Sequence, residues 1–65
     1  MDIEVVMRET TMHINLPEPV TGTDVLKQLN LLPDTVIILV DGKPIPYTEE
    51  IKTSCIRIIQ VASGG

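Results

Sequence analysis

The sequence predicts a single α+β domain, in which a four-stranded mixed sheet carries one helix packed across one face. The chain has 65 residues, which is material for one hydrophobic core and no second one. Ile and Val far outnumber Leu and Ala among its apolar residues, and this bias favours strands. Apolar residues alternate with polar ones in the first two predicted strands, form an uninterrupted run over 36–40, and follow a helical period in one segment. The resulting order is strand, strand, helix, strand, strand.

The first two strands are predicted to form a hairpin. Apolar and polar residues alternate over residues 2–7 and again over 11–16, and the polar segment 8–10 separates the two runs. One side of this hairpin is therefore expected to face the core, with inward positions Ile3, Val5, Met12 and Ile14.

A helix is predicted after the strand-breaking segment 17–22. Thr23 is expected to cap its start, with Asp24 favourably placed in the first turn. At ~100° per residue, four apolar residues fall within an arc of about 120° and form the face that covers the sheet: Val25, Leu26, Leu29 and Leu32. We expect Pro33 to end the helix.

The β-branched segment 35–40 predicts a third strand. Asp41 and Gly42 follow it and are typical of a tight turn. The next segment, 43–46, contains two prolines and is expected to be irregular.

The remaining residues predict a polar connector over 47–53 and a last strand over 55–61. Ile51 is expected to anchor the connector in the core. Alternation places one set of side chains of the last two strands against the helix, namely Val36, Ile38, Ile56 and Ile58.

Composition excludes several classes of protein. With a net charge of −4 and Tyr47 as the sole aromatic residue, the chain lacks the basic surface and the stacking platform of a nucleic-acid-binding protein. No apolar run approaches the ~20 residues of a membrane span, and the first residues do not resemble a signal peptide. We therefore expect a soluble, cytoplasmic protein. Its exposed acids, Asp34, Asp41, Glu49 and Glu50, are read as a solubilising rim that also suits a basic partner.

The sequence predicts no catalytic residues and no metal site. Cys55 and His13 are the single cysteine and the single histidine, so disulfide and zinc frameworks are excluded. Cys55 is expected to be a semi-buried structural thiol, and His13 a solvated hairpin residue. Neither a phosphate-binding loop nor a nucleophile with its base is present, so we expect the chain not to be an enzyme.

Two motifs resemble those of a known family. Val36–Pro46, with the sequence VIILVDGKPIP, is similar to the strand, turn and Ile-Pro segment of the β-grasp sulfur carriers of the ThiS and MoaD type, which are relatives of ubiquitin. The ending from Ile58 to Gly65, with the sequence IIQVASGG, resembles their C-terminus still more closely, and the chain looks most like the short archaeal ubiquitin-like small modifier proteins. The resemblance implies a β-grasp fold with the strands in spatial order 2-1-4-3. It also implies a β-grasp domain over residues 1–61 and a flexible tail over 62–65.

The resemblance also implies a function. An activating enzyme of the ThiF or MoeB type is expected to adenylate the Gly65 carboxylate with ATP and Mg²⁺, and the chain itself binds no cofactor. Gly64 has no Cβ and would let the tail thread a narrow channel. The product is expected to be a thiocarboxylate, formed with a sulfurtransferase or passed to a sulfur-accepting synthase for thiamin, molybdopterin or tRNA thiolation. One alternative is a protein modifier joined to target lysines by isopeptide bonds. A further alternative is a non-covalent interaction domain.

Strict alternation predicts where the activating enzyme docks. If one set of side chains faces the helix, the other set lies on the open face of the sheet, namely Val6, Ile37, Leu39 and Ile59, with Arg57 beside them. An exposed apolar patch rimmed by polar groups commonly marks a partner site. Raised strand propensity or a homodimer contact would account for the same pattern.

Overall fold

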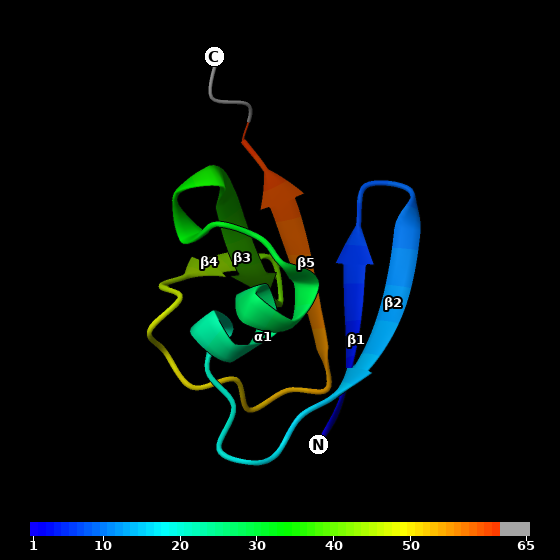
Figure 1. Cartoon of the computed structure of the whole chain (residues 1–65). Coiled ribbons are helices and arrows are strands. Elements are labelled where there is room, and N and C mark those ends of the chain that lie inside the picture. Colours follow the sequence, from blue (N-terminus) through cyan, green and yellow to red (C-terminus); the bar gives the residue numbers. More distant parts are fainter. Residues whose placement is uncertain (62–65) are drawn as a thin grey trace.

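The computed structural model describes residues 1–61 and consists of one sheet, one α-helix and one short 3₁₀ turn (Figure 1). The elements follow each other as β1 (Asp2–Met7), β2 (Thr10–Asn15), α1 (Gly22–Leu29), η1 (Pro33–Thr35), β3 (Val36–Val40), β4 (Lys43–Ile45) and β5 (Cys55–Gln60). The tail predicted over 62–65 lies outside the described residues.

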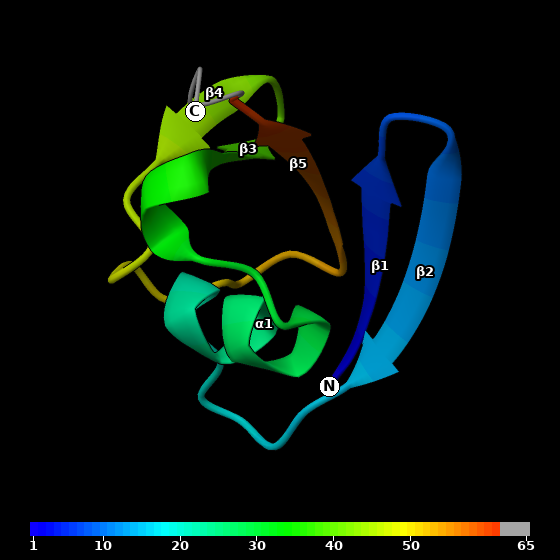
Figure 2. The ribbon, with the colours of Figure 1, turned by 45° about the horizontal axis from the view of Figure 1, so that its top comes forward.

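The sheet has the strand order β2-β1-β5-β3-β4. Its two central strands, β1 and β5, are parallel, while the β1–β2, β3–β5 and β3–β4 pairs are antiparallel. The helix lies against one face, and the strands curve around it (Figure 2). This arrangement confirms the α+β class, the β-grasp architecture and the predicted order of the four main strands.

A fifth strand, β4, extends the sheet beyond the prediction. We expected residues 43–46 to be irregular because of their prolines, and this was wrong for Lys43–Ile45. β4 is an edge strand, so it forms backbone hydrogen bonds with one neighbour, β3. Pro44 lies opposite Leu39 in this pairing. An edge strand tolerates a proline because the missing N–H need not serve a second neighbour. The predicted turn before it is present, since Asp41 and Gly42 both have positive φ, 53° and 78°.

The helix begins two residues earlier than predicted. Thr21, and not Thr23, is the N-cap. The Asp24 backbone N–H donates to Thr21 Oγ1 at 3.3 Å, and the Thr21 backbone N–H donates to Asp24 Oδ2 at 2.9 Å. This reciprocal capping box serves two N–H groups that the first turn would otherwise leave without partners. Thr23 instead donates its hydroxyl to the Tyr47 carbonyl oxygen at 3.2 Å.

The helix also ends earlier than predicted, before Pro33. Asn30 takes the left-handed conformation with φ 60°, and its N–H bonds to the carbonyls of Leu26 and Lys27. Asparagine tolerates this conformation better than most residues and commonly ends a helix in this way. Leu32 therefore lies outside the helix and is 69% exposed, so its predicted place on the covering face is wrong.

The core lies between the helix and the concave face of the sheet. Among the residues predicted to face the helix, Ile3, Val5, Ile38, Ile56 and Ile58 are buried, Ile14 and Val36 pack at the margin, and Met12 is partly buried. Val25 and Leu26 cover them from α1, and the predicted anchor Ile51 is 2% exposed. Val20 was not predicted and is 1% exposed; it directly precedes the N-cap Thr21.

The 47–51 connector holds the start of the helix. The Gly22 and Thr23 N–H groups donate to the carbonyls of Glu49 and Tyr47, at 3.2 and 2.8 Å. The Ile51 N–H in turn donates to the Val20 carbonyl at 2.6 Å. The connector thus accepts hydrogen bonds from the first turn of the helix and seals the core at that end.

Candidate functional site

The face of the sheet opposite the helix carries the residues that the sequence predicts for docking. Val6, Arg57 and Leu39 stand side by side across three strands, because Val6 pairs with Arg57 in the parallel ladder and Arg57 pairs with Leu39 in the antiparallel one. Ile59 pairs with Ile37 two residues further along. The structure therefore places all five residues on one face, next to the end of β5.

Exposure differs among these side chains. Ile37 is 39% exposed and Ile59 is 43% exposed, whereas Val6 and Leu39 are half-buried. Val6 and Leu39 are the two pairing neighbours of Arg57 on this face. Among the predicted residues, the most accessible apolar side chains are thus those of the paired residues Ile37 and Ile59, with Arg57 beside them.

A polar row lies on the same face, further toward the start of β5. His13, Glu4 and Cys55 occupy one row across β2, β1 and β5. His13 Nε2 is 3.9 Å from Glu4 Oε1, and the Cys55 thiol lies 3.9 Å from Glu4 Oε2. His13 is exposed, as predicted, but Cys55 is also exposed, so the expected semi-buried thiol is wrong. Cys55 begins β5 with its side chain on the face that the helix does not cover.

The structure shows a cleft that sequence reasoning missed. It has a volume of about 580 Å³ and is lined by residues of the β1–β2 turn and of β5. The ribbon shows that this turn and the end of β5 lie at the same end of the sheet (Figures 1 and 2). The lining residues of the cleft are Met7, Arg8, Thr10, Met12, Arg57, Ile58, Ile59 and Gln60. The sequence offered little signal for it, because Arg8 follows the end of β1 while Arg57 lies inside β5, and nothing in the two segments alone brings them together.

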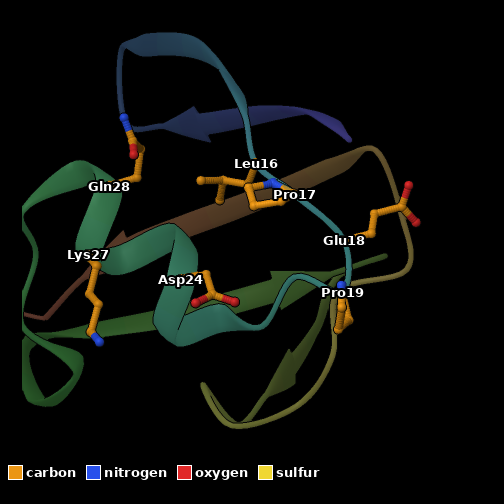
Figure 3. Close-up of a pocket in the computed structure, with 7 residues that line it drawn as sticks. All are labelled: Leu16, Pro17, Glu18, Pro19, Asp24, Lys27 and Gln28. Carbon is orange, nitrogen blue, oxygen red and sulfur yellow. The ribbon is translucent and has the colours of Figure 1, made fainter.

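A second hollow, of about 410 Å³, lies on the helix side between the 16–19 loop and α1 (Figure 3). Its side chains do not converge on one point, since Lys27 and Glu18 are directed away from each other. Its other carboxylate, that of Asp24, is engaged in the capping box. The Thr21 backbone N–H, then the Thr21 hydroxyl, and more weakly the charge of Lys27, lower the pKa of Asp24 below 3.8. This hollow is therefore formed around a structural hydrogen bond and is remote from the open face.

Other kinds of site are not formed within residues 1–61. No group of three or more His, Cys, Asp and Glu side chains in this range is placed to hold a metal ion. No helix in the same range is long and apolar enough to cross a bilayer. The predicted carrier residues Gly64 and Gly65 lie outside the described range, beyond Val61, whose N–H donates to the Thr35 carbonyl at 2.8 Å.

Comparison with known proteins assigns a family. The family model for Small archaeal modifier protein 2 matches residues 1–62. A relative from Haloferax volcanii, Small archaeal modifier protein 2, is 29% identical over 63 residues, which span 97% of this chain and 94% of that protein. The match covers every helix and strand described above.

Proposed function

The chain belongs to the Small archaeal modifier protein 2 family, a family of ubiquitin-like modifiers, and we propose that it is joined through Gly65 to amino groups of target proteins. The family match over residues 1–62 carries this proposal. The β-grasp fold supports it, because the last strand, β5, lies at the centre of the sheet, and Gly64 and Gly65 follow it within five residues in the sequence.

The proposed chemistry has two steps. A carboxylate oxygen of Gly65 attacks the α-phosphorus of ATP in a partner enzyme, which forms an acyl-adenylate and releases pyrophosphate. A lysine amine of the target then attacks the acyl carbon, AMP leaves, and the amine loses its proton to a base. Activation is needed because a free carboxylate is a poor acyl electrophile. The ATP site, the Mg²⁺ and the acid–base groups would belong to the partner enzyme.

Sulfur transfer is the second candidate function, and it uses the same acyl-adenylate. The motif Val36–Pro46 and the Gly64-Gly65 ending support it, because they resemble those of the ThiS and MoaD carriers. Attack by the outer sulfur of a persulfide instead of an amine would displace AMP and form an acyl disulfide on Gly65. A thiol would then cleave the S–S bond of this acyl disulfide, which leaves a thiocarboxylate on Gly65 and carries the other sulfur away as a disulfide. The two functions then differ in the nucleophile that meets the adenylate.

Intact-mass measurement of the protein from its native host tests both functions and shows whether the mature chain ends at Gly65. Trypsin cleaves after Arg57, so an isopeptide conjugate would appear as a lysine of a larger protein that carries residues 58–65 of this chain. A thiocarboxylate would appear as replacement of one oxygen by sulfur. Deletion of Gly65 should abolish ATP-dependent activation and leave the fold unchanged. A truncated chain that is still activated would refute both functions and leave a non-covalent interaction domain.

We propose that the open face docks the activating enzyme through Ile37, Ile59 and Leu39, beside Arg57. Leu39→Asp and Ile59→Asp should weaken docking by roughly 2 kcal/mol, as expected for central interface residues. Gln28→Asp is the matched control, since it adds the same charge on the exposed side of the helix. Activation kinetics of both variants equal to those of the control would exclude this face.

A further inference from the structure

The cleft between the β1–β2 turn and the end of β5 concentrates the arginines of an acidic chain. The net charge is −4, yet Arg8 and Arg57, the two arginines of the sequence, both line this one cleft. None of its lining residues is acidic, and Glu9 in the neighbouring turn is not among them. Within residues 1–61 neither arginine forms an ion pair. Two arginines that form no ion pair within residues 1–61 therefore line one hollow.

The walls between the arginines are mainly apolar. Met7 and Met12 contribute from the hairpin, and Ile58 and Ile59 from β5. Ile59 is 43% exposed, so part of this apolar surface is accessible to a partner. Methionine side chains adapt to different occupants because their torsions and thioethers are flexible.

At the cleft, one residue of β5 has backbone hydrogen-bonding groups that β1 does not pair. The parallel ladder between β1 and β5 ends at the pair Met7 and Ile58, while β5 continues to Gln60. The Val61 N–H donates toward Thr35 on the β3 side, and successive residues of a strand direct their amide groups to opposite sides. The Gln60 N–H and C=O therefore point toward the cleft, where no backbone partner from residues 1–61 reaches them.

We infer that this cleft binds an extended, acidic and apolar peptide segment of a partner protein. Guanidinium groups bind carboxylates in a planar, bidentate geometry, so Arg8 and Arg57 select an acidic segment. The apolar walls accept alternate side chains of an extended strand, and Gln60 supplies main-chain hydrogen bonds, as in strand addition to a sheet edge. A segment seated here would lie beside the point where β5 ends and the chain continues toward Gly65. This inference rests on the proposed function only in naming the activating enzyme as the partner.

Titration of the isotope-labelled full chain by NMR tests the binding chemistry directly. The probes are a capped peptide, acetyl-Val-Glu-Leu-Asp-Val-amide, its counterpart with lysine in place of both acids, and inorganic phosphate. We expect the acidic peptide to shift the Arg8 and Gln60 amides and both arginine Nε–H signals. Arg8→Glu and Arg8→Gln should each weaken this binding about tenfold or more. Lys27→Glu, which carries the same charge change as Arg8→Glu on the exposed helix surface, should not.

Each other outcome overturns the inference. Equal shifts with the lysine peptide would show that charge does not select the ligand. Equal shifts with phosphate alone would show an anion site and not a peptide site. Shifts confined to other parts of the sheet would place the site elsewhere. Chemical shifts of the unliganded variants show directly whether they keep the fold.

A second measurement tests whether the cleft binds the activating enzyme. ATP–pyrophosphate exchange by the adenylating enzyme of the host is followed as a function of the concentration of this chain. Arg8→Glu should raise the KM for the chain about tenfold with kcat unchanged, because the cleft positions the partner and takes no part in the chemistry. An unchanged KM would show that the activating enzyme does not bind in the cleft. If the wild-type chain supports no exchange, the proposed function fails, while the peptide titration still decides the cleft.

Discussion

Gly22→Ala should strongly destabilise the fold, although alanine is the better helix former. A Cβ built on Gly22 would lie 2.7 Å from Ile38 Cδ1 and 2.8 Å from both Cα and the carbonyl oxygen of Tyr47. The isoleucine tip can rotate away, but the Tyr47 atoms belong to the backbone. The connector must therefore move, and it is the segment that accepts hydrogen bonds from the first turn of the helix.

The expected change in the free energy of unfolding combines two destabilising contributions and one stabilising contribution. Overpacking in a tightly filled site costs about 1–3 kcal/mol. Displacing the connector weakens the bonds from Gly22 to Glu49 and from Thr23 to Tyr47, worth about 1 kcal/mol each. Alanine recovers at most about 1 kcal/mol through helix propensity and a less flexible unfolded chain. A net loss of roughly 2–3 kcal/mol remains, in a domain of a size that seldom has more than about 5 kcal/mol of stability.

Thermal unfolding followed by circular dichroism measures this loss. For a domain of this length it corresponds to a fall in Tm of roughly 10–20 °C. Gly42→Ala is the matched control, because nothing lies within 4 Å of its Cβ position and the cost comes from its φ of 78° alone. That cost is about 1 kcal/mol. A Gly22→Ala variant as stable as the wild type, or more stable than Gly42→Ala, would refute the reasoning.

Three further predictions concern the helix cap and the connector. Thr21→Ala should lower the free energy of unfolding by about 1 kcal/mol in urea titrations, whereas Thr23→Ala should change it less, because Thr21 is the N-cap. The pKa of Asp24 is lowered in the folded state, so its ionised carboxylate stabilises the fold above pH 3.8, and this stabilisation is lost as the pH falls below that value. The free energy of unfolding measured against pH should show this loss, and the Asp24→Asn variant should lack this pH dependence. Ile51→Ala should cost about 2–4 kcal/mol, since the side chain is 2% exposed, and an unchanged urea midpoint would show that the connector is not anchored there.

Residue alternation predicted the sheet because each main strand has one buried face. Ile56 and Ile58 are buried while Arg57 and Ile59 are exposed, as a period of two requires. A shift of one residue would have exchanged these sets, so the register had a single acceptable solution. The same alternation placed Ile37 and Leu39 on the open face.

The helix boundaries were not predictable in the same way. Thr21 and Thr23 are the same residue type two positions apart, and the choice between them depends on the connector, which bonds to Gly22 and Thr23 from a distant part of the chain. The early end at Asn30 follows from a single left-handed residue, and local patterns predict such ends poorly. Pro44 could enter a strand because tertiary structure placed that strand at an edge.

The cleft was not predictable because it arises from the offset with which β1 and β5, both six residues long, pair with each other. β1 ends its pairing at Met7, while β5 continues past Ile58. Nothing in either segment alone indicates which residues of the other it will face. Arg8 and Arg57 both line the cleft because the first and last strands are neighbours in the sheet.

The central place of β5 allows stability and partner binding to be separated by mutation. Ile56 and Ile58 point into the core, so replacing them removes packing and lowers activation through the folded fraction. Arg57 and Ile59, on the same strand, point away from the core, so replacing them should lower activation at constant stability. Variants at adjacent positions of β5 should therefore differ: one kind loses stability together with activation, and the other loses activation alone. If Ile59→Asp lowered Tm as much as Ile58→Ala does, the open face would be part of the fold and not a docking surface.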